Sequence, residues 1–373
     1  MTLVIIYHFF FIIYHLVMAS LTKVAITSRK IIRYSIYAAI LLIIGKFTIN
    51  TVTRIYRHYY PAPPPPPTVT FGKLPQIPFQ ETKFPDNLTF TLQTPDGKLP
   101  KFPTQATVYF MPKAISTIKS LDAAKQKATQ LGFNPNGREL VETVYLFRHN
   151  TSPVSLNLNI VTGIFSVSYD LSSKPQVIQT LPPTAEVAPT WAKAFLSRAR
   201  ILPADLTGPV TSEFVKIQEG RFVKASSLSD ANLTKVNLYR KNYHDLPSVT
   251  SKFKQANVWF MFSGARDPGD QIIAAEYHYF ALDENKNGTY QIKTASDAWE
   301  DLKSGKAYIA NLGDNNEGNI IIRKVYLAYY DAGQYTEFYQ PVVVFEGDND
   351  FSAYVPAVTS EFYGSTSPTA TPQ

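Results

Sequence analysis

Residues 294–358 read TASDAWEDLKSGKAYIANLGDNNEGNIIIRKVYLAYYDAGQYTEFYQPVVVFEGDNDFSAYVPAV, and this stretch decides the expected fold. Thr294 with Asp297 three residues later is typical of the capping box that begins a helix. Four apolar residues then recur at i, i+3, i+4 and i+7 and share one helix face: Ala295, Ala298, Trp299 and Leu302. Gly305 follows the last of them, at the position where a glycine commonly ends a helix.

Three segments after this helix are rich in β-branched and aromatic residues, which is typical of strands: 320–330, 339–345 and 351–358. Turn-forming residues separate these segments at 331–333 and 347–350. A helix of about three turns is not stable alone, so its apolar face must pack on something. The stretch therefore predicts a short helix packed on a three-stranded antiparallel meander.

The same order of elements occurs in two earlier windows. The first window has a helical pattern and three strand-like segments: 120–132, then 141–147, 154–160 and 164–169. Within it, VETVYLFRHN (141–150) aligns with IRKVYLAYYD (322–331). The second window is fainter and has four corresponding segments: 189–199, then 234–239, 258–262 and 272–282. The first of these is a predicted helix with Trp191, Ala192, Phe195 and Ala199 on one face. Repetition of this kind predicts an α+β fold of tandem modules, each a short helix packed on an antiparallel meander. The alternative is an α+β chain whose elements merely alternate.

Several motifs are similar to those of the YycH/YycI and PepSY group: Ala295-x-x-Ala298-Trp299-x-x-Leu302-x-x-Gly305, Val325-x-Leu327-x-Tyr329, Gln340-Pro341-Val342 and Tyr354-Val355-x-Ala357. Members of this group are bacterial proteins that stand outside the cell on a membrane anchor. The resemblance implies tandem helix-on-sheet modules with binding or regulatory roles, such as restraint of a sensor kinase or a peptidase, and no catalysis. The matching positions are core and turn positions, so no functional residue is transferred.

The resemblance and the element pattern together predict five regions. These are a membrane anchor at 1–58, a proline-rich stalk at 59–103, an N-terminal PepSY-like module at 104–180, a C-terminal α+β region at 184–358 with a YycI-like module at 294–358, and a disordered tail at 359–373. The tail is expected to be disordered because it is small, polar and ends in STSPTATPQ.

Composition excludes several classes of site. The 373 residues include no cysteine, which excludes disulfides, thiolate metal sites and cysteine nucleophiles. Aromatic residues make up 13% of the chain, which favours strands over long helical bundles. The net charge is +7, and the stretch from Lys23 to Arg57 alone holds seven Lys and Arg residues. We therefore do not interpret the positive charge as a nucleic-acid footprint.

Two apolar segments near the N-terminus, 3–18 and 34–45, are candidates for membrane spans. The second reaches the ~20 residues of a spanning helix if it continues through Val52 with Lys46 snorkelling. One span is therefore expected at about 34–52, with 3–18 as an optional second. If Met18 is the true start, the basic residues that follow lead into a single span. The soluble alternative is that residues 34–45 form a buried core helix. A cleaved signal peptide is not expected, because no small-residue cleavage site follows the apolar segment.

The charges near the span predict its orientation. Four basic residues precede the apolar segment and are expected to stay inside: Lys23, Arg29, Lys30 and Arg33. The C-terminal domain is then expected outside the cytoplasm, at the cell membrane. Residues 61–67 are PAPPPPP, which predicts extended polyproline II and hence a stiff stalk. A docking site for a polyproline-binding module is the alternative for this run.

The chain carries no recognisable catalytic motif, such as G-x-S-x-G or H-E-x-x-H. The sequence DENKNG at 283–288 matches the first half of a calcium loop, but Thr294 stands where the loop needs Glu, so a hairpin turn explains it equally well. Four carboxylates are candidates for a glycosidase pair, although their spacing does not favour one: Glu213, Glu219, Asp267 and Glu276. His149, His244 and His278 lack ligand spacing, and each is expected on a strand surface or in the core. We expect a non-enzyme with no metal and no cofactor.

Six aromatic residues crowd one predicted hairpin and form the candidate binding surface: Tyr326, Tyr329, Tyr330, Tyr335, Phe338 and Tyr339. If one face of the meander is open, they bind a peptide or a glycan; otherwise they cover the helix–sheet core. We expect a non-catalytic regulatory protein that binds the membrane and an envelope protein partner, such as a sensor kinase or a peptidase, and no nucleic acid. The alternatives are a glycan- or peptide-processing envelope enzyme and a structural envelope protein.

Overall fold

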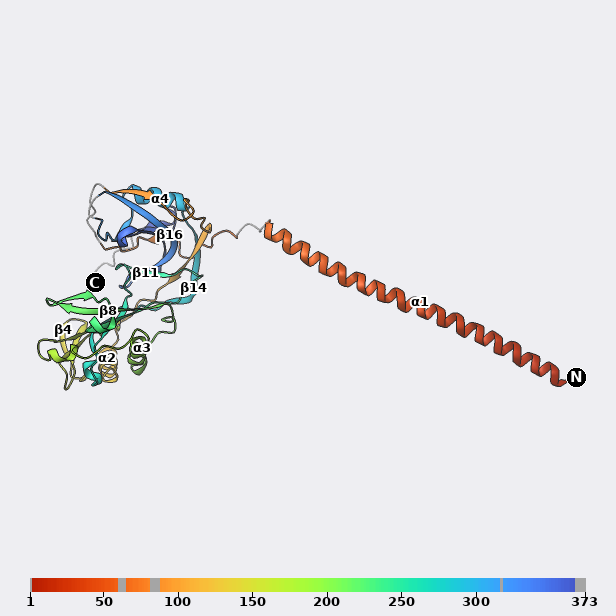
Figure 1. Ribbon diagram of the computed structural model, residues 1–373, viewed down its shortest axis with the longest axis horizontal. Coiled ribbons are helices and arrows are strands. Elements are labelled where there is room, and N and C mark those ends of the chain that lie inside the picture. Colours follow the sequence, from red (N-terminus) through yellow and green to blue (C-terminus); the bar gives the residue numbers. More distant parts are fainter. Residues whose placement is uncertain (1, 60–64, 81–87, 316–317, 366–373) are drawn as a thin grey trace. The chain divides into compact units, whose positions relative to one another are not determined.

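The computed structural model describes residues 2–59, 65–80, 88–315 and 318–365 of the chain (Figure 1). These residues form two compact units, which divide between Pro66 and Pro67. The first unit contains one long helix, and the second is a body that holds all the strands and short helices of the described chain. The protein is therefore an α+β protein with a long N-terminal helix and a body rich in antiparallel sheet.

Helix α1 (Thr2–Tyr59) runs for 58 residues without a break. At 1.5 Å per residue it is about 87 Å long, nearly three times the ~30 Å of a bilayer's hydrocarbon core. Its segment Lys23–Tyr56 is long and apolar enough to cross a membrane, and its described side chains are largely exposed within the first unit. This segment contains the predicted span at 34–52. The optional span at 3–18 is helical, but its side chains lie outside the described ones.

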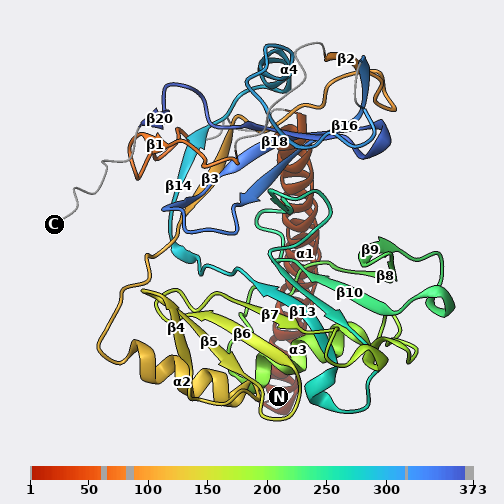
Figure 2. The same cartoon turned by 90° about the vertical axis from the view of Figure 1, so that its left-hand side faces the viewer.

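A nine-stranded antiparallel sheet forms one half of the body, in the order β4-β5-β6-β7-β13-β12-β10-β8-β9 (Figure 2). Its strands are β4 (Arg138–Val141), β5 (Val144–Arg148), β6 (Val154–Asn159), β7 (Phe165–Tyr169), β8 (Val210–Gln218), β9 (Arg221–Lys224), β10 (Leu233–Leu238), β12 (Val258–Phe262) and β13 (Ile272–Tyr277). Helices α2 (Ser120–Gln130) and α3 (Ala188–Arg198) cover one face of it. One continuous apolar core lies between these helices and the sheet.

The middle of this sheet joins strands that are far apart in the sequence. Strand β7 pairs with β13, so that Ser168 lies opposite Ala274. Pairing of two strand edges satisfies backbone groups that each edge would otherwise expose. The predicted regions 104–180 and 184–358 therefore share one sheet, which corrects their expected separation. Strand β3 (Gln105–Phe110), which also falls within the region 104–180, lies in a different sheet.

The helix and meander predicted for residues 294–358 are confirmed. Helix α4 (Ala295–Lys303) contacts the meander of β16 (Asn319–Asp331), β18 (Pro341–Gly347) and β19 (Ser352–Pro356). The capping box is present, because the Thr294 hydroxyl accepts from the Asp297 amide and the Asp297 carboxylate accepts from the Thr294 amide, both at 3.2 Å. Gly305 has a φ of +76° just after the helix. The Trp299 ring centroid lies 5.9 Å from that of Phe345.

Three further strands complete this second sheet. β15 (Tyr308–Asn311) pairs with β19, while β11 (Ser248–Thr250) and β2 (Thr89–Leu92) pair with β16 in parallel. A three-stranded sheet contains β14 (Asp283–Gln291), β3 (Gln105–Phe110) and β17 (Phe338–Tyr339), and β1 (Leu74–Pro75) pairs with β20 (Tyr363–Ser365). Short 3₁₀ turns are η1 (Pro175–Ile178), η2 (Leu228–Asp230), η3 (Pro268–Asp270) and η4 (Asp348–Asp350).

The structure corrects the predicted stalk and tail. The described residues from Pro67 to 103 belong to the body and not to a free stalk. Leu74 and Ile77 are buried there, and the Phe71 amide donates to the Tyr290 hydroxyl at 2.9 Å. Apolar side chains between the prolines hold this segment against the body. In the predicted tail, residues 363–365 form β20, whereas residues 366–373 lie outside the described part.

Candidate binding site

The six aromatic residues predicted as a binding surface lie mostly in the core. Tyr329, Tyr330, Phe338 and Tyr339 are buried, while Tyr326 and Tyr335 are half-buried. The rings of Tyr329 and Tyr339 stack with centroids 4.8 Å apart, and the Tyr329 hydroxyl donates to the Thr107 carbonyl at 2.8 Å. These four buried residues therefore do not form an accessible surface.

Their burial follows from how the meander is covered. The alternative with an open face requires that only α4 pack on the sheet. Val325 and Leu327 of β16 belong to the core beneath α4, whereas Ala328 and Tyr330 pack in a second core with Ile77. Strand β18 is buried from Pro341 through Phe345, as is typical of a strand covered on both faces. Segments distant in sequence supply the second cover.

A buried charge cluster joins the two large sheets, and its contacts are structural. Arg240, just after β10, donates to Asp205 Oδ2 at 2.6 Å and to Asp331 Oδ2 at 2.8 Å, and also bonds the Phe280 carbonyl. Burial alone would lower the pKa of the Arg240 guanidinium, but the carboxylates of Asp331 and Asp205 outweigh it and raise that pKa. Both carboxylates are thus held by a permanent cation, and neither is free for acid–base chemistry.

The four carboxylates considered for glycoside hydrolysis each have a different environment in the structure. Glu213 pairs with Lys235 at 3.2 Å, and Glu276 pairs with His278 at 2.8 Å. Asp267 accepts from the Gly269 amide at 2.9 Å, and Glu219 lies exposed after β8. Strands β10 and β12 lie between Glu213 on β8 and Glu276 on β13, which places these two carboxylates roughly 14 Å apart at about 4.8 Å per strand. This separation exceeds the ~5–9.5 Å of a glycosidase pair, so these two residues do not form one.

The segment 283–288, which resembles half a calcium loop, is not a hairpin turn. It lies in β14 next to β3, with an irregularity that places Asp283 opposite Phe110 and Asn287 opposite Tyr109. Extra residues in one strand bulge out of the ladder. The prediction of a hairpin turn was wrong. The segment pairs with β3 at residues 105–110, far earlier in the chain, and not with a neighbouring strand. Within the described residues, no group of three potential metal ligands occurs here or elsewhere.

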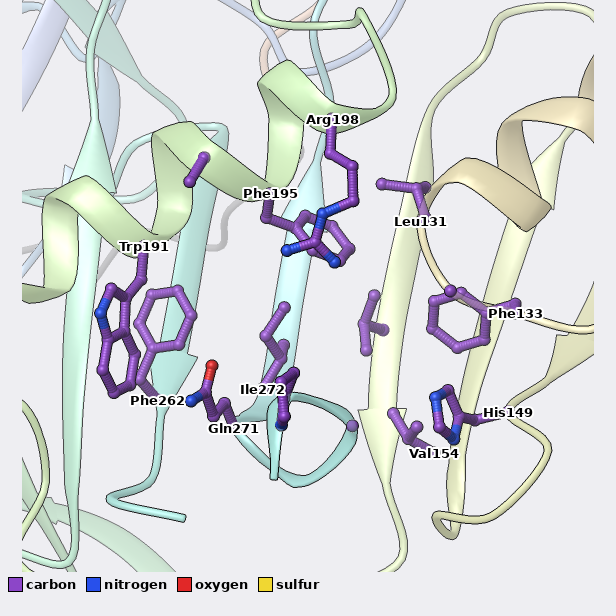
Figure 3. A pocket seen from close by; sticks show the side chains of 15 residues that line it. Leu131, Phe133, His149, Val154, Trp191, Phe195, Arg198, Phe262, Gln271 and Ile272 are labelled. Atoms are coloured by element: carbon purple, nitrogen blue, oxygen red, sulfur yellow. The ribbon is translucent and has the colours of Figure 1, made fainter. Parts of the chain in front are cut away.

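A cavity of about 170 Å³ lies between α2 and α3, above the strands around the β7–β13 seam (Figure 3). Most of the residues that line it are apolar, and they include Phe133, Val154, Trp191, Phe195, Phe262 and Ile272. The Trp191 ring meets that of Phe262 edge-on at 5.8 Å, with 85° between their planes. His149, Arg198 and Gln271 are the polar side chains at this cavity. We call it the inter-helix cavity.

Helix periodicity and one loop build this cavity. Trp191, Phe195 and Arg198 are spaced i, i+4 and i+7, so α3 presents all three toward it, as Figure 3 shows. Gly269 allows the η3 loop to approach closely, because a Cβ there would lie 2.7 Å from His149 Cε1. Glycine is therefore needed at this contact for its size.

His149 has a defined tautomer when its ring is neutral. Its Nδ1 accepts from the backbone amides of Ser152 at 3.1 Å and Thr151 at 3.3 Å. An Nδ1 that accepts carries no proton, so the proton of the neutral ring lies on Nε2. His149 therefore provides an N–H donor from its second nitrogen, and that ring lines the cavity.

Asp270 anchors the η3 loop at the cavity, and the residues on either side of it, Gly269 and Gln271, line the cavity. The Tyr169 hydroxyl donates to its Oδ1 at 2.8 Å, and the Lys174 ammonium bonds its Oδ2. Burial would raise the pKa of the Asp270 carboxyl, but hydrogen bonds from Lys174, Tyr169 and Ser152 outweigh burial and lower that pKa.

This lowered pKa predicts a pH dependence of stability. Because the folded-state pKa lies below the ordinary value of 3.8, the stabilisation is present above pH 3.8 and is lost as the pH falls through the folded pKa. Asp270→Asn should therefore lose less stability than the natural protein as the pH falls through this range. Urea midpoints of the full chain in detergent from pH 6 to pH 2.5 measure the difference. The control Asp96→Asn, at an exposed turn, should show the same dependence of the urea midpoint on pH as the natural protein. If Asp270→Asn also shows the natural dependence, the stabilising role of the Asp270 carboxylate is refuted.

Sequence reasoning identified part of the inter-helix cavity and missed the rest. Trp191 and Phe195 were placed on one face of a predicted helix, and His149 was interpreted as a strand or core residue. Arg198 was missed, although its position seven residues after Trp191 places it on the same face. Phe262 and Gln271 carry no such signal, because they reach the cavity only through the β7–β13 pairing.

Fold and site define the class of this protein: an α+β protein with one N-terminal helix long and apolar enough to span a membrane, and an antiparallel body with an apolar cavity. No family model matches the chain, and no curated protein matches it. The predicted resemblance to the YycH/YycI and PepSY group thus has no support from a family model.

Two solved structures are similar in part. One is an uncharacterized protein from Eubacterium rectale ATCC 33656, with 13% identity and a TM-score of 0.39, over 76% of this chain and 92% of that chain. The other is the YpeB C-terminal domain of Bacillus megaterium, with 11% identity and a TM-score of 0.31, over 67% of this chain and 96% of that chain. Neither likeness identifies the family of this chain.

Proposed function

We propose that this protein is a membrane-tethered binding protein whose body lies outside the cytoplasm and acts, without catalysis, on an envelope protein partner such as a sensor kinase or a peptidase. The carrying observation is the length and apolar composition of α1 from Lys23 to Tyr56, which are enough to cross a membrane. An apolar surface of this length is stable in lipid and costly in water.

The proposed orientation rests on charge. Lys23, Arg29, Lys30 and Arg33 precede the most apolar part of the helix, and basic residues favour the cytoplasmic side. Lys46, Arg54 and Arg57 lie toward the other end, so the difference between the two ends is one charge. The proposed single span would place everything after it, including the whole body, outside the cytoplasm.

We further propose that the body consists of three tandem PepSY-like modules. Each of α2, α3 and α4 packs on antiparallel strands, most of which follow it in the chain. In this interpretation the first two modules share one sheet through β7 and β13, and the third is the YycI-like module at 294–358. Edge pairing of two meanders would leave the groove between their helices as the common binding face, where the inter-helix cavity lies.

A binding role is supported by the chemistry of the candidate groups. The carboxylates of Asp205 and Asp331 are neutralised by Arg240, and those of Glu213 and Glu276 have basic partners of their own. Most of the residues that line the inter-helix cavity are apolar, and none of them is a carboxylate. Such a site can hold a ligand but offers no acid–base pair to transform it.

The experiment is photo-crosslinking of the full chain in its membrane. A photoreactive amino acid in place of Ala194, an exposed residue at the rim of the cavity, should give a discrete adduct with a second polypeptide. The matched control replaces Phe222, which is 51% exposed on the edge strand β9, and should give no adduct. An adduct with glycan alone, equal adducts at both positions, or none at either would contradict a protein partner at this face.

A further inference from the structure

The inter-helix cavity has room for one large apolar side chain. Its volume is about 170 Å³, and an apolar cavity of about 150 Å³ is enough to hold one benzene ring. Drug-sized ligands use pockets of about 300–1,000 Å³. The occupant therefore inserts a single aromatic or branched aliphatic group between Trp191, Phe195 and Ile272, while the rest of it remains outside.

The polar groups at this cavity are donors that suit an anion. Arg198 is exposed at its rim, and no described carboxylate forms an ion pair with it. His149 provides the Nε2–H, since its Nδ1 accepts backbone amides. No Asp or Glu is among the lining residues, and the Asp267 carboxylate, next to the lining residue Pro268, accepts a hydrogen bond from the Gly269 amide.

A second depression continues the positive charge beyond His149. His149 also lines this open depression, together with Arg138 and Arg148. No acidic residue lines it, and neither of these arginines has an ion-pair partner among the described residues. Unpaired guanidinium groups attract carboxylates and bind them in a bidentate manner. The surroundings of the cavity therefore favour a negatively charged ligand.

We propose that the inter-helix cavity binds the free C-terminal residue of a polypeptide, with its apolar side chain in the cavity and its carboxylate against Arg198. A C-terminal residue carries both groups on one Cα, so one residue satisfies the apolar cavity and the adjacent donors. The preceding residues then extend away from the mouth, which is open to solvent. This inference rests on the proposed binding function and specifies the end of the partner that is recognised.

The test measures peptide binding to the full chain in detergent by isothermal titration calorimetry. The probes are acetyl-Ala-Ala-Phe with a free carboxylate, the same peptide as its C-terminal amide, and acetyl-Ala-Ala-Ala with a free carboxylate. The free-acid Phe peptide should bind at least about tenfold more tightly than either other peptide. The amide lacks the charge-assisted hydrogen bond of the carboxylate, and the Ala peptide lacks the ring that the cavity buries. Free phenylacetate should bind no better than the amide, because a small acid lacks the backbone of the peptide.

Variants locate the site. Arg198→Gln should remove the preference for the free acid over the amide, whereas Arg200→Gln, the same charge change at an exposed position outside the cavity, should keep it. Ala194→Trp should block the mouth and weaken both Phe peptides. Equal binding of acid and amide, no binding of any peptide, or full binding by Ala194→Trp would overturn the proposal. Phenylacetate binding as tight as the peptide would also overturn it, in favour of a small-acid site. None of these results would conflict with a protein adduct at Ala194 in cells. The peptide experiment therefore tests recognition of the C-terminal residue, and the crosslinking experiment tests the broader binding function.

Discussion

Replacing Arg240 with methionine is expected to lower the free energy of unfolding by about 3–5 kcal/mol, because it leaves two buried carboxylates without their cation. Arg240 is 2% exposed and contacts Asp205, Asp331 and the Phe280 carbonyl. It also connects the end of β10 in the nine-stranded sheet to the end of β16 in the second sheet. Urea unfolding of the full chain in detergent, followed by circular dichroism, measures the loss.

Arg323→Met is the matched control for this prediction. Arg323 likewise makes two hydrogen bonds to carboxylate oxygens, but both go to Asp348, and this pair lies exposed at the surface. Water and salt screen such a pair, so its loss should be much smaller. Combining Arg240→Met with Asp205→Asn and Asp331→Asn should recover part of the stability, since no unpaired charge is then buried. Equal losses for Arg240→Met and Arg323→Met would refute the structural role of the cluster.

Phe338→Ala is expected to lower the free energy of unfolding by about 3–5 kcal/mol, the range for truncating a buried phenylalanine. Phe338 is buried, and its ring centroid lies 4.8 Å from that of Phe71 and 6.2 Å from that of Phe110. The substitution removes a side chain that holds residues once predicted as stalk against the body. The same urea measurement gives the change.

Phe222→Ala provides the comparison, because Phe222 is half exposed on an edge strand and its loss should change stability by less than about 0.5 kcal/mol. If Phe338 instead belonged to an open binding surface, both substitutions would have similarly small effects on unfolding. Such a result would restore the original interpretation of the six aromatic residues.

The part of the fold that sequence could predict is the part that local chemistry determines. The capping box of Thr294 and Asp297 forms as expected, and so does the meander from residue 319 to 356. The parallel additions of β2 and β11 to β16 could not be predicted, because each is a short segment whose partner lies more than 70 residues away. These additions extend the sheet beside β16, whereas the segment around Ile77 packs on the face whose exposure the sequence left undecided.

The candidate site was harder to predict for the same reason. The helix face with Trp191 and Phe195 follows from periodicity, but a cavity needs its opposite wall. That wall consists of Phe133 after α2 and Ile272 in β13, which are brought together when β7 and β13 pair. The proline-rich segment was misjudged because composition favours an extended spacer, whereas Leu74 and Ile77 within it are buried.

The most direct test of the central claim, a body tethered outside the cytoplasm, uses the absence of natural cysteine. Single thiols are introduced as Ser226→Cys in the body and Ser28→Cys in the basic segment before the span, both exposed positions. A membrane-impermeant maleimide applied to intact spheroplasts should label Ser226→Cys at once and Ser28→Cys only after the membrane is permeabilised. Labelling of Ser28→Cys alone, or of neither thiol before permeabilisation, would contradict the claim.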